Sequence, residues 1–100
     1  MPNAGLINSF EGPAGRDEEF VSHVRAAAAG LKEAEGFVST KLHKSLDDTA
    51  RFRFVNVAKW TSARHFQLAV QSDAFQAVSR KLNFAAYPSL YDVILTIESD

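Results

Sequence analysis

The sequence has 100 residues, enough for one domain of ordinary size, and we expect residues 1–100 to form a single domain. Hydrophobic residues make up 46% and charged residues 23% of the chain, which is typical of a globular protein and excludes a disordered or fibrous one. With 11 Lys and Arg against 12 Asp and Glu, the formal charge is -1, so no basic surface is expected for nucleic acid or an anionic membrane. The sequence has no cysteine, which excludes disulfides and thiolate-bound zinc or iron–sulfur centres.

The opening segment, MPNAGLINSF, has neither the basic start nor the apolar stretch of a secretion signal. No apolar run approaches the roughly 20 residues that cross a membrane as a helix. We therefore expect a cytoplasmic protein with no membrane partner.

The first half of the chain predicts a strand, a helix and a second strand. Residues 6–11 alternate apolar and polar side chains and end at a Gly-Pro turn cluster. Acidic residues at 17–19 favour a helix N-terminus, and we expect this helix to end near Gly36. Its apolar side chains recur at helical spacing, at Phe20, Val24, Ala27, Ala28 and Leu31. Residues 37–45 alternate again and predict the second strand, which ends before the turn at Asp47 and Asp48.

The segment from residue 52 to residue 60 predicts a third strand with an aromatic face. A period of two places Phe52, Phe54, Asn56, Ala58 and Trp60 on one side, and Arg53, Val55, Val57 and Lys59 on the other. Short helices are expected after a cap at Thr61 or Ser62 and after a second cap at Ser72, and Pro88 is expected to end the helical region. The alternation at residues 91–98 predicts the last strand.

This order of elements predicts an α+β protein with a ferredoxin-like, four-stranded antiparallel sheet and helices on one face. The other face of the sheet would then carry Val55 and Val57 without a covering layer. A bare apolar sheet face usually has a partner, so we expect a face-to-face homodimer.

Three groups of residues carry a family resemblance: Gly36-Phe37, the strand from Asn56 to Trp60 with the serine that follows it, and the cap from Ser72 to Phe75. In these residues, and over nearly its whole length, the chain resembles the antibiotic biosynthesis monooxygenase (ABM) family. The resemblance implies a dimeric α/β barrel. Members of this fold include cofactor-independent quinone-forming monooxygenases, haem-degrading enzymes and isomerases.

The resemblance to the quinone-forming members implies oxidation of an aromatic or polyketide-like phenol or anthrone by dioxygen, without metal or flavin. In such a reaction the deprotonated substrate itself reduces dioxygen, and the protein supplies orientation and charge stabilisation. Carried onto this sequence, the family's asparagine and tryptophan fall at Asn56 and Trp60, and its arginine falls at Arg80. We expect Asn56 and Trp60 to hold substrate oxygen atoms and Arg80 to stabilise negative charge. Phe54, Phe66 and Asn8 are the expected substrate-binding residues.

One position departs from the family. Its phenolic tyrosine falls at Phe66, which has no hydroxyl to exchange a proton, so His65 or His43 would have to replace it. Each candidate also has an ordinary structural explanation. Trp60 is explained by core packing, Asn56 by an internal hydrogen bond, and Arg80 by a solvated helix surface.

The sequence leaves other functions open. A non-catalytic binding or dimerisation module would explain Phe66, and an isomerase or cyclase would use the same pocket without oxygen. The haem-degrading alternative is disfavoured because its axial histidine falls at Ser79 and its second-helix tryptophan at Ala69, with only Asn8 in place. The histidines His23, His43 and His65 lack metal-ligand spacing, so no metal site is predicted.

Overall fold

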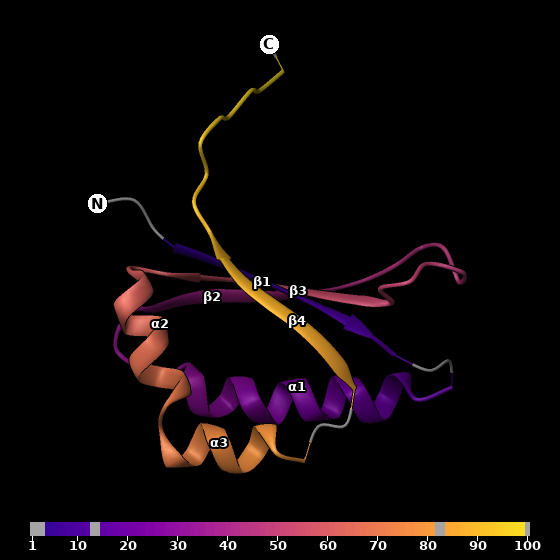
Figure 1. The fold of residues 1–100 in the computed structure, drawn as a ribbon, viewed down its shortest axis with the longest axis horizontal. Coiled ribbons are helices and arrows are strands. Elements are labelled where there is room, and N and C mark those ends of the chain that lie inside the picture. The colour runs from indigo at the N-terminus through magenta and orange to yellow at the C-terminus, as the bar shows by residue number, and fades with distance from the viewer. Residues whose placement is uncertain (1–3, 13–14, 82–83, 100) are drawn as a thin grey trace.

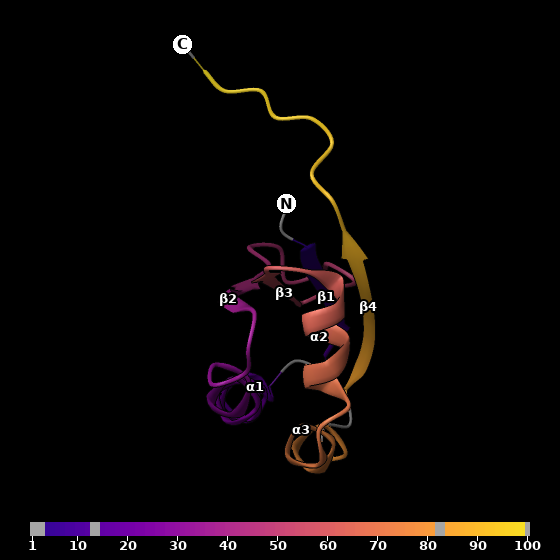
Figure 2. The ribbon, with the colours of Figure 1, turned by 90° about the vertical axis from the view of Figure 1, so that its left-hand side faces the viewer.

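A computed structural model describes residues 4–12, 15–81 and 84–99 of the chain. The elements are β1 (Ala4–Glu11), α1 (Asp17–Leu31), β2 (Phe37–Lys44), β3 (Phe54–Trp60), α2 (Ala63–Val70), α3 (Asp73–Ser79) and β4 (Ala85–Tyr91). The four strands form an antiparallel sheet in the order β2-β3-β1-β4. The helices lie on one face of this sheet (Figures 1 and 2), which confirms the ferredoxin-like α+β fold.

The last strand lies earlier in the chain than predicted. β4 pairs with β1 from Glu11↔Ala85 to Gly5↔Tyr91, and Pro88 lies within it. Because β4 is an edge strand, it tolerates a proline whose missing N–H would face away from the neighbouring strand. Residues 92–98 form no strand and leave the sheet as an extended tail (Figure 1), so the alternation at 91–98 was misleading.

The third strand starts two residues later than predicted, which changes the direction of the side chains before it. Phe52 was expected on the inner face, but its ring packs against that of Tyr87, with centroids 5.5 Å apart. Arg53 was expected on the bare face, but its guanidinium reaches Asp17 at the start of α1. The period of two applies only from Phe54 onward, because the preceding residues belong to the loop.

The core is a cluster of four phenylalanines, and the ring at its centre belongs to Phe20, which is fully buried on α1. Its ring stacks on Phe54 with a centroid distance of 4.5 Å and an interplanar angle of 20°. Phe10 and Phe84 meet the same ring edge-on, at 4.8 Å and 5.0 Å. These contacts hold α1 against β1 and β3, so the helix cannot shift along the sheet without breaking all three.

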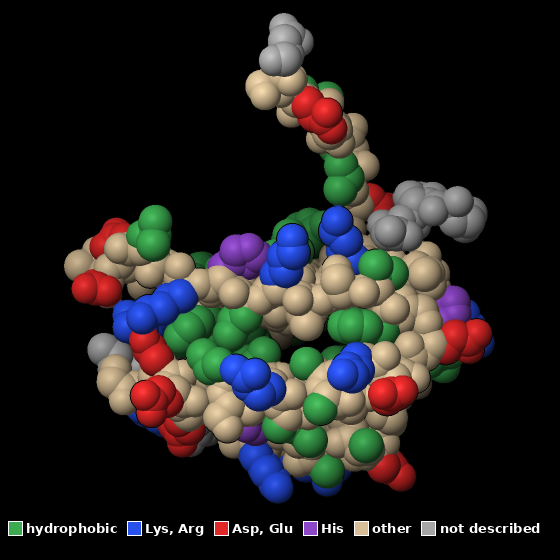
Figure 3. All heavy atoms as spheres, turned by 180° about the vertical axis from the view of Figure 1, so that it is seen from behind, with side chains coloured by type: hydrophobic (Ala, Val, Ile, Leu, Met, Phe, Trp, Pro, Cys, Tyr) green, Lys and Arg blue, Asp and Glu red, His purple; other side chains and the backbone are tan. Residues whose placement is uncertain are grey.

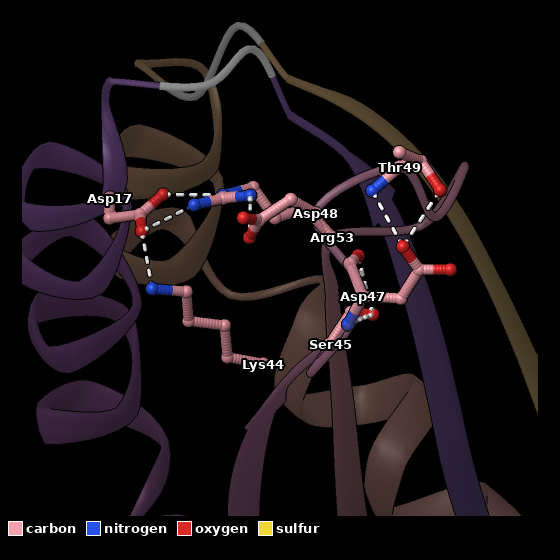
Figure 4. A network of polar contacts seen from close by, with 7 residues as sticks. All are labelled: Asp17, Lys44, Ser45, Asp47, Asp48, Thr49 and Arg53. Atoms are coloured by element: carbon pink, nitrogen blue, oxygen red, sulfur yellow. Dashed lines mark hydrogen bonds and ion pairs between the residues drawn. The ribbon is translucent and has the colours of Figure 1, made fainter.

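Ion pairs anchor the N-terminus of the same helix to the β2–β3 hairpin (Figure 4). Arg53 donates two hydrogen bonds to the carboxylate of Asp17, at 2.7 Å and 2.9 Å, and Nζ of Lys44 lies 2.8 Å from Oδ2 of that carboxylate. The hydrogen bonds from Arg53 hold the pKa of Asp17 well below its usual range, and the hydrogen bond from Lys44 is the second-largest cause of this lowering. The ionised carboxylate therefore fixes the helix start both to the end of β2 and to the loop before β3.

We predict that Phe20→Ala lowers the free energy of unfolding by about 3–5 kcal/mol, because it removes a fully buried ring and leaves a cavity between helix and sheet. Urea unfolding followed by circular dichroism measures this loss. Leu68→Ala is the control, since that side chain is 53% exposed and should change stability by less than about 0.5 kcal/mol. Equal losses for the two variants would contradict the assigned core.

A second prediction concerns pH. Because the pKa of Asp17 is lower in the folded than in the unfolded chain, its stabilisation is complete above the unfolded value of about 4 and is lost as the pH falls below it. Asp17→Asn should therefore lower the melting temperature by several degrees at pH 7, and the difference from wild type should shrink at pH 3. Asp48→Asn is the control, because that side chain is 93% exposed. A difference that stays constant with pH would contradict the ion-pair explanation.

Candidate functional site

A cavity of about 630 Å³ lies between the inner face of the sheet and the helices. Seen from behind, the surface is hollowed between the sheet and α1, and apolar side chains gather around the hollow (Figure 3). All four strands and all three helices contribute lining residues, most of them apolar, such as Leu6, Val24, Leu31, Phe66 and Phe75. Its volume is in the range of sites that enclose a small molecule.

Two asparagines form part of the sheet side of this cavity. Asn8 of β1 and Asn56 of β3 are direct cross-strand partners, and both line the cavity. The hydroxyl of Thr40 donates a hydrogen bond of 2.8 Å to Oδ1 of Asn56. This bond occupies the Asn56 carbonyl oxygen and directs the amide N–H groups of that side chain to other partners. Asn56 thus has both the structural hydrogen bond and the position at the cavity that the sequence left as alternatives.

Trp60 is 1% exposed and is held between two rings at the end of the same strand. Phe37 packs edge-on against it with centroids 5.3 Å apart, and Phe66 does so at 5.7 Å. The indole is therefore part of the packing, as the structural explanation required, and it also lines the cavity. Phe66 and Asn8 likewise line the cavity, and their expected contact with a substrate stays a prediction.

Three buried polar atoms have no hydrogen-bond partner within the described part of the chain. They are Oδ1 of Asn8, Nε2 of His23 and Nε1 of Trp60, and all three residues line the cavity. A buried polar atom without a partner costs about 1–3 kcal/mol, so three of them around one space are unusual in a region built only for packing. They are an acceptor, a donor and an imidazole nitrogen that lie closed within the cavity wall, so a bound molecule would satisfy them after a small rotation of each side chain.

Sequence reasoning gave little weight to His23. The signal was its place three residues after Phe20, which puts both side chains on the same side of α1. Among the sequence-based expectations, His23 is considered only as a metal ligand, whereas in the structure it lines the cavity.

The other predicted residues lie away from the cavity lining. Arg80 is the exposed C-cap of α3, and His43 is exposed on edge strand β2 with Nδ1 3.3 Å from the Val55 carbonyl oxygen. Phe54 lies in the core against Phe20. The structure thus brings Asn8, Asn56, Trp60 and Phe66 together without these three, whose proposed contributions to the chemistry stay predictions.

His65 has a local structural role at the start of α2. Its backbone N–H donates to the hydroxyl of the N-cap Ser62, and its Nδ1 lies 2.7 Å from the same oxygen. Its ring packs on Gly36, whose φ is +89°, so a β-carbon at position 36 would overlap the imidazole. The His65 ring therefore joins the start of α2 to the turn before β2, outside the cavity lining.

Comparison with known families agrees with this architecture. Residues 4–81 match the profile of the family described as antibiotic biosynthesis monooxygenase. The chain belongs to this family. A search of curated proteins found no match.

Solved structures of ABM-like proteins share the whole fold. A protein from Shewanella loihica PV-4, provisionally described as a monooxygenase, is 34% identical with a TM-score of 0.84, over 95% of this chain and 97% of that one. SnoaB of Streptomyces nogalater, a cofactor-independent oxygenase, is 21% identical with a TM-score of 0.80, over 99% and 100%. A haem-degrading protein of Mycobacterium tuberculosis is 21% identical with a TM-score of 0.72, over 99% of each chain. The last two similarities concern the fold alone.

Two further observations bear on cofactors and location. Within the described ranges, no three His, Cys, Asp or Glu side chains gather as metal ligands would, and no helix has the length and hydrophobicity needed to span a membrane. At the position predicted for a haem ligand, Ser79 lines the cavity and its hydroxyl donates to the Gln76 carbonyl at 3.3 Å. A serine hydroxyl is not among the usual axial ligands of haem iron, so this position does not fit haem.

Proposed function

We propose that this ABM family member is a cofactor-independent monooxygenase that oxidises an aromatic or polyketide-like phenol or anthrone with dioxygen. The observation that carries the proposal is the apolar cavity with unpartnered polar atoms on its walls. Apolar walls suit a flat ring system, and a few polar atoms suit its oxygen substituents.

The reaction needs charge stabilisation more than a redox centre. Removal of a proton from the substrate gives a carbanion, which transfers an electron to dioxygen and then forms a carbon–oxygen bond with it. Loss of water from the resulting peroxide leaves one oxygen atom in the quinone and the other in water. The indole N–H of Trp60 and the amide N–H groups of Asn56 are the donors that would stabilise the oxyanion, because both residues line the cavity.

Oxygen uptake tests the proposal. With anthrone in metal-free buffer, an oxygen electrode should record a rate above the uncatalysed one, and Asn56→Ala or Trp60→Phe should reduce the catalysed rate about 10²-fold, as loss of an oxyanion donor does. Gln67→Ala, at an exposed position of α2, is the control and should match wild type. Circular dichroism confirms that each variant is folded.

Two results would overturn this assignment. One is a wild-type rate equal to the uncatalysed rate with anthrone and several hydroquinones. The other is a stoichiometric Soret band on addition of hemin, together with hemin-dependent turnover.

Phe66 favours a second candidate, a non-catalytic module that binds the same class of molecule. Its ring lies at the cavity. The resemblance to the quinone-forming members implies a tyrosine, with its phenolic hydroxyl, at this position. Ligand binding without oxygen uptake would support this candidate, and turnover of an enolisable substrate under nitrogen would indicate an isomerase or cyclase instead.

We also propose that two chains associate through the helix-free face of the sheet. Ile7, Val55 and Val57 are only half-buried there, because the helices cover the opposite face (Figure 2). The tail beyond Tyr91 adds aliphatic side chains that are 73–94% exposed: Val93, Ile94, Leu95 and Ile97. Pairing of two such faces would remove this apolar surface from water and make a homodimer.

Size-exclusion chromatography with light scattering tests the dimer. Wild type should have twice the mass of one chain, and Val57→Glu should have the mass of one chain. Val57 lies between its cross-strand partners Ile7 and Lys41, so a glutamate there would place a charge inside the interface, where it is buried against the second chain. Ala26→Glu, exposed on α1, should remain dimeric. A monomeric wild type, or a dimeric Val57→Glu, would contradict this interface.

A further inference from the structure

We infer that His23 is the proton acceptor of this site and contacts the substrate hydroxyl or acidic carbon from the α1 wall. The inference rests on the proposed function and deepens it, because Phe66 leaves the deprotonation step without the family's phenol.

Among the residues that the structure describes, His23 is the only one on the cavity wall with an acid–base side chain. The other polar lining residues are Asn8, Thr40, Asn56, Trp60, Ser79 and Ser89, and the lining includes no Asp, Glu, Lys, Arg or Tyr. Imidazole is also the side chain best suited to accept and release a proton near neutral pH. A proton that leaves a molecule inside this cavity therefore has one direct acceptor.

The Nε2 atom of His23 is buried and has no partner in the protein. The nearest acidic candidate on the helix, Glu19, is held instead by Arg16, whose Nε lies 2.6 Å from the Glu19 carboxylate. That hydrogen bond is the main cause of the lowered pKa of Glu19. The His23 nitrogen is thus left for a molecule in the cavity.

The two sides of the cavity are chemically complementary. The sheet side offers hydrogen-bond donors from Trp60 and Asn56, and α1 offers the base. An anthrone lying between them would direct its carbonyl oxygen, where negative charge develops, to the sheet and its acidic methylene hydrogens to the helix. A phenol would present its acidic hydroxyl to the helix.

The proton balance of the reaction closes through this one residue. Nε2 accepts the first proton of the anthrone methylene, and the electron pair left on carbon reduces dioxygen and forms the carbon–oxygen bond. The imidazolium then protonates the distal peroxide oxygen. Nε2 takes the second carbon-bound proton as the oxygen–oxygen bond breaks, and it returns this proton to the departing hydroxide as water.

Binding is tested without turnover. Trp60 is the only tryptophan in the sequence, so its indole N–H gives a single NMR signal at the cavity wall. Titration with 1-naphthol and with 1-methylnaphthalene, which has the same shape but no hydroxyl, should shift this signal. His23→Leu should raise the Kd of 1-naphthol about threefold to tenfold, as loss of one hydrogen bond does. It should leave the Kd of 1-methylnaphthalene within about twofold of the wild-type value. Equal effects on both ligands, or on neither, would overturn the contact.

Proton transfer is tested by His23→Gln, which keeps a hydrogen-bonding side chain but cannot act as the base. In the oxygen-uptake assay with anthrone, the kcat of this variant should be at least about 10²-fold lower than that of wild type, with little change in KM. Ser22→Ala, the exposed neighbour on α1, should keep the wild-type rate. A His23→Gln variant with the wild-type kcat would overturn the inference.

These measurements separate the two proposals. A wild-type protein that consumes no oxygen overturns the monooxygenase and the proton transfer, while the naphthol pair still decides whether His23 contacts the ligand. Oxygen uptake that survives in His23→Gln supports the monooxygenase and overturns the role of His23.

Discussion

The stacking of Phe20 on Phe54 determines where α1 lies, and the candidate site depends on that position. The stacked pair and the two edge-on rings beside it fix the helix to the middle of the sheet. His23 follows Phe20 by three residues, so the same contact directs the imidazole to the cavity. The ion pairs of Asp17 hold the helix one turn earlier. Core packing and the geometry of the site are therefore one constraint.

The cavity carries a cost that packing alone does not explain. The unpartnered atoms of Asn8, His23 and Trp60 each lower the free energy of unfolding by about 1–3 kcal/mol. The side chains that line the cavity also lose the van der Waals contacts that a filled interior would give them. A domain of this size has only about 5–15 kcal/mol of net stability. Retaining such a space is consistent with a binding site whose polar atoms are satisfied by a guest.

Much of the architecture was predictable from the sequence, because the side chains of the third strand alternate regularly between its two faces. The alternation from Phe54 to Trp60 placed the amide and the indole on the inner side, and the caps at Ser62 and Ser72 marked the helices correctly. The last strand was placed too late because Pro88 lies within it, while the residues beyond it alternate as a strand would. His23 was undervalued because a helical pattern shows which side a residue faces but not whether that side is filled.

The proline in β4 limits how copies of this chain can meet. Position 88 lies in the middle of an outer strand, whose free edge would otherwise present the backbone N–H of every second residue to a neighbouring chain. Because proline has no backbone N–H to donate, it interrupts the pairing of another strand with this edge of the sheet. Growth into long ribbons is thereby discouraged on this side, and stacking of broad surfaces is left as the less restricted way to assemble.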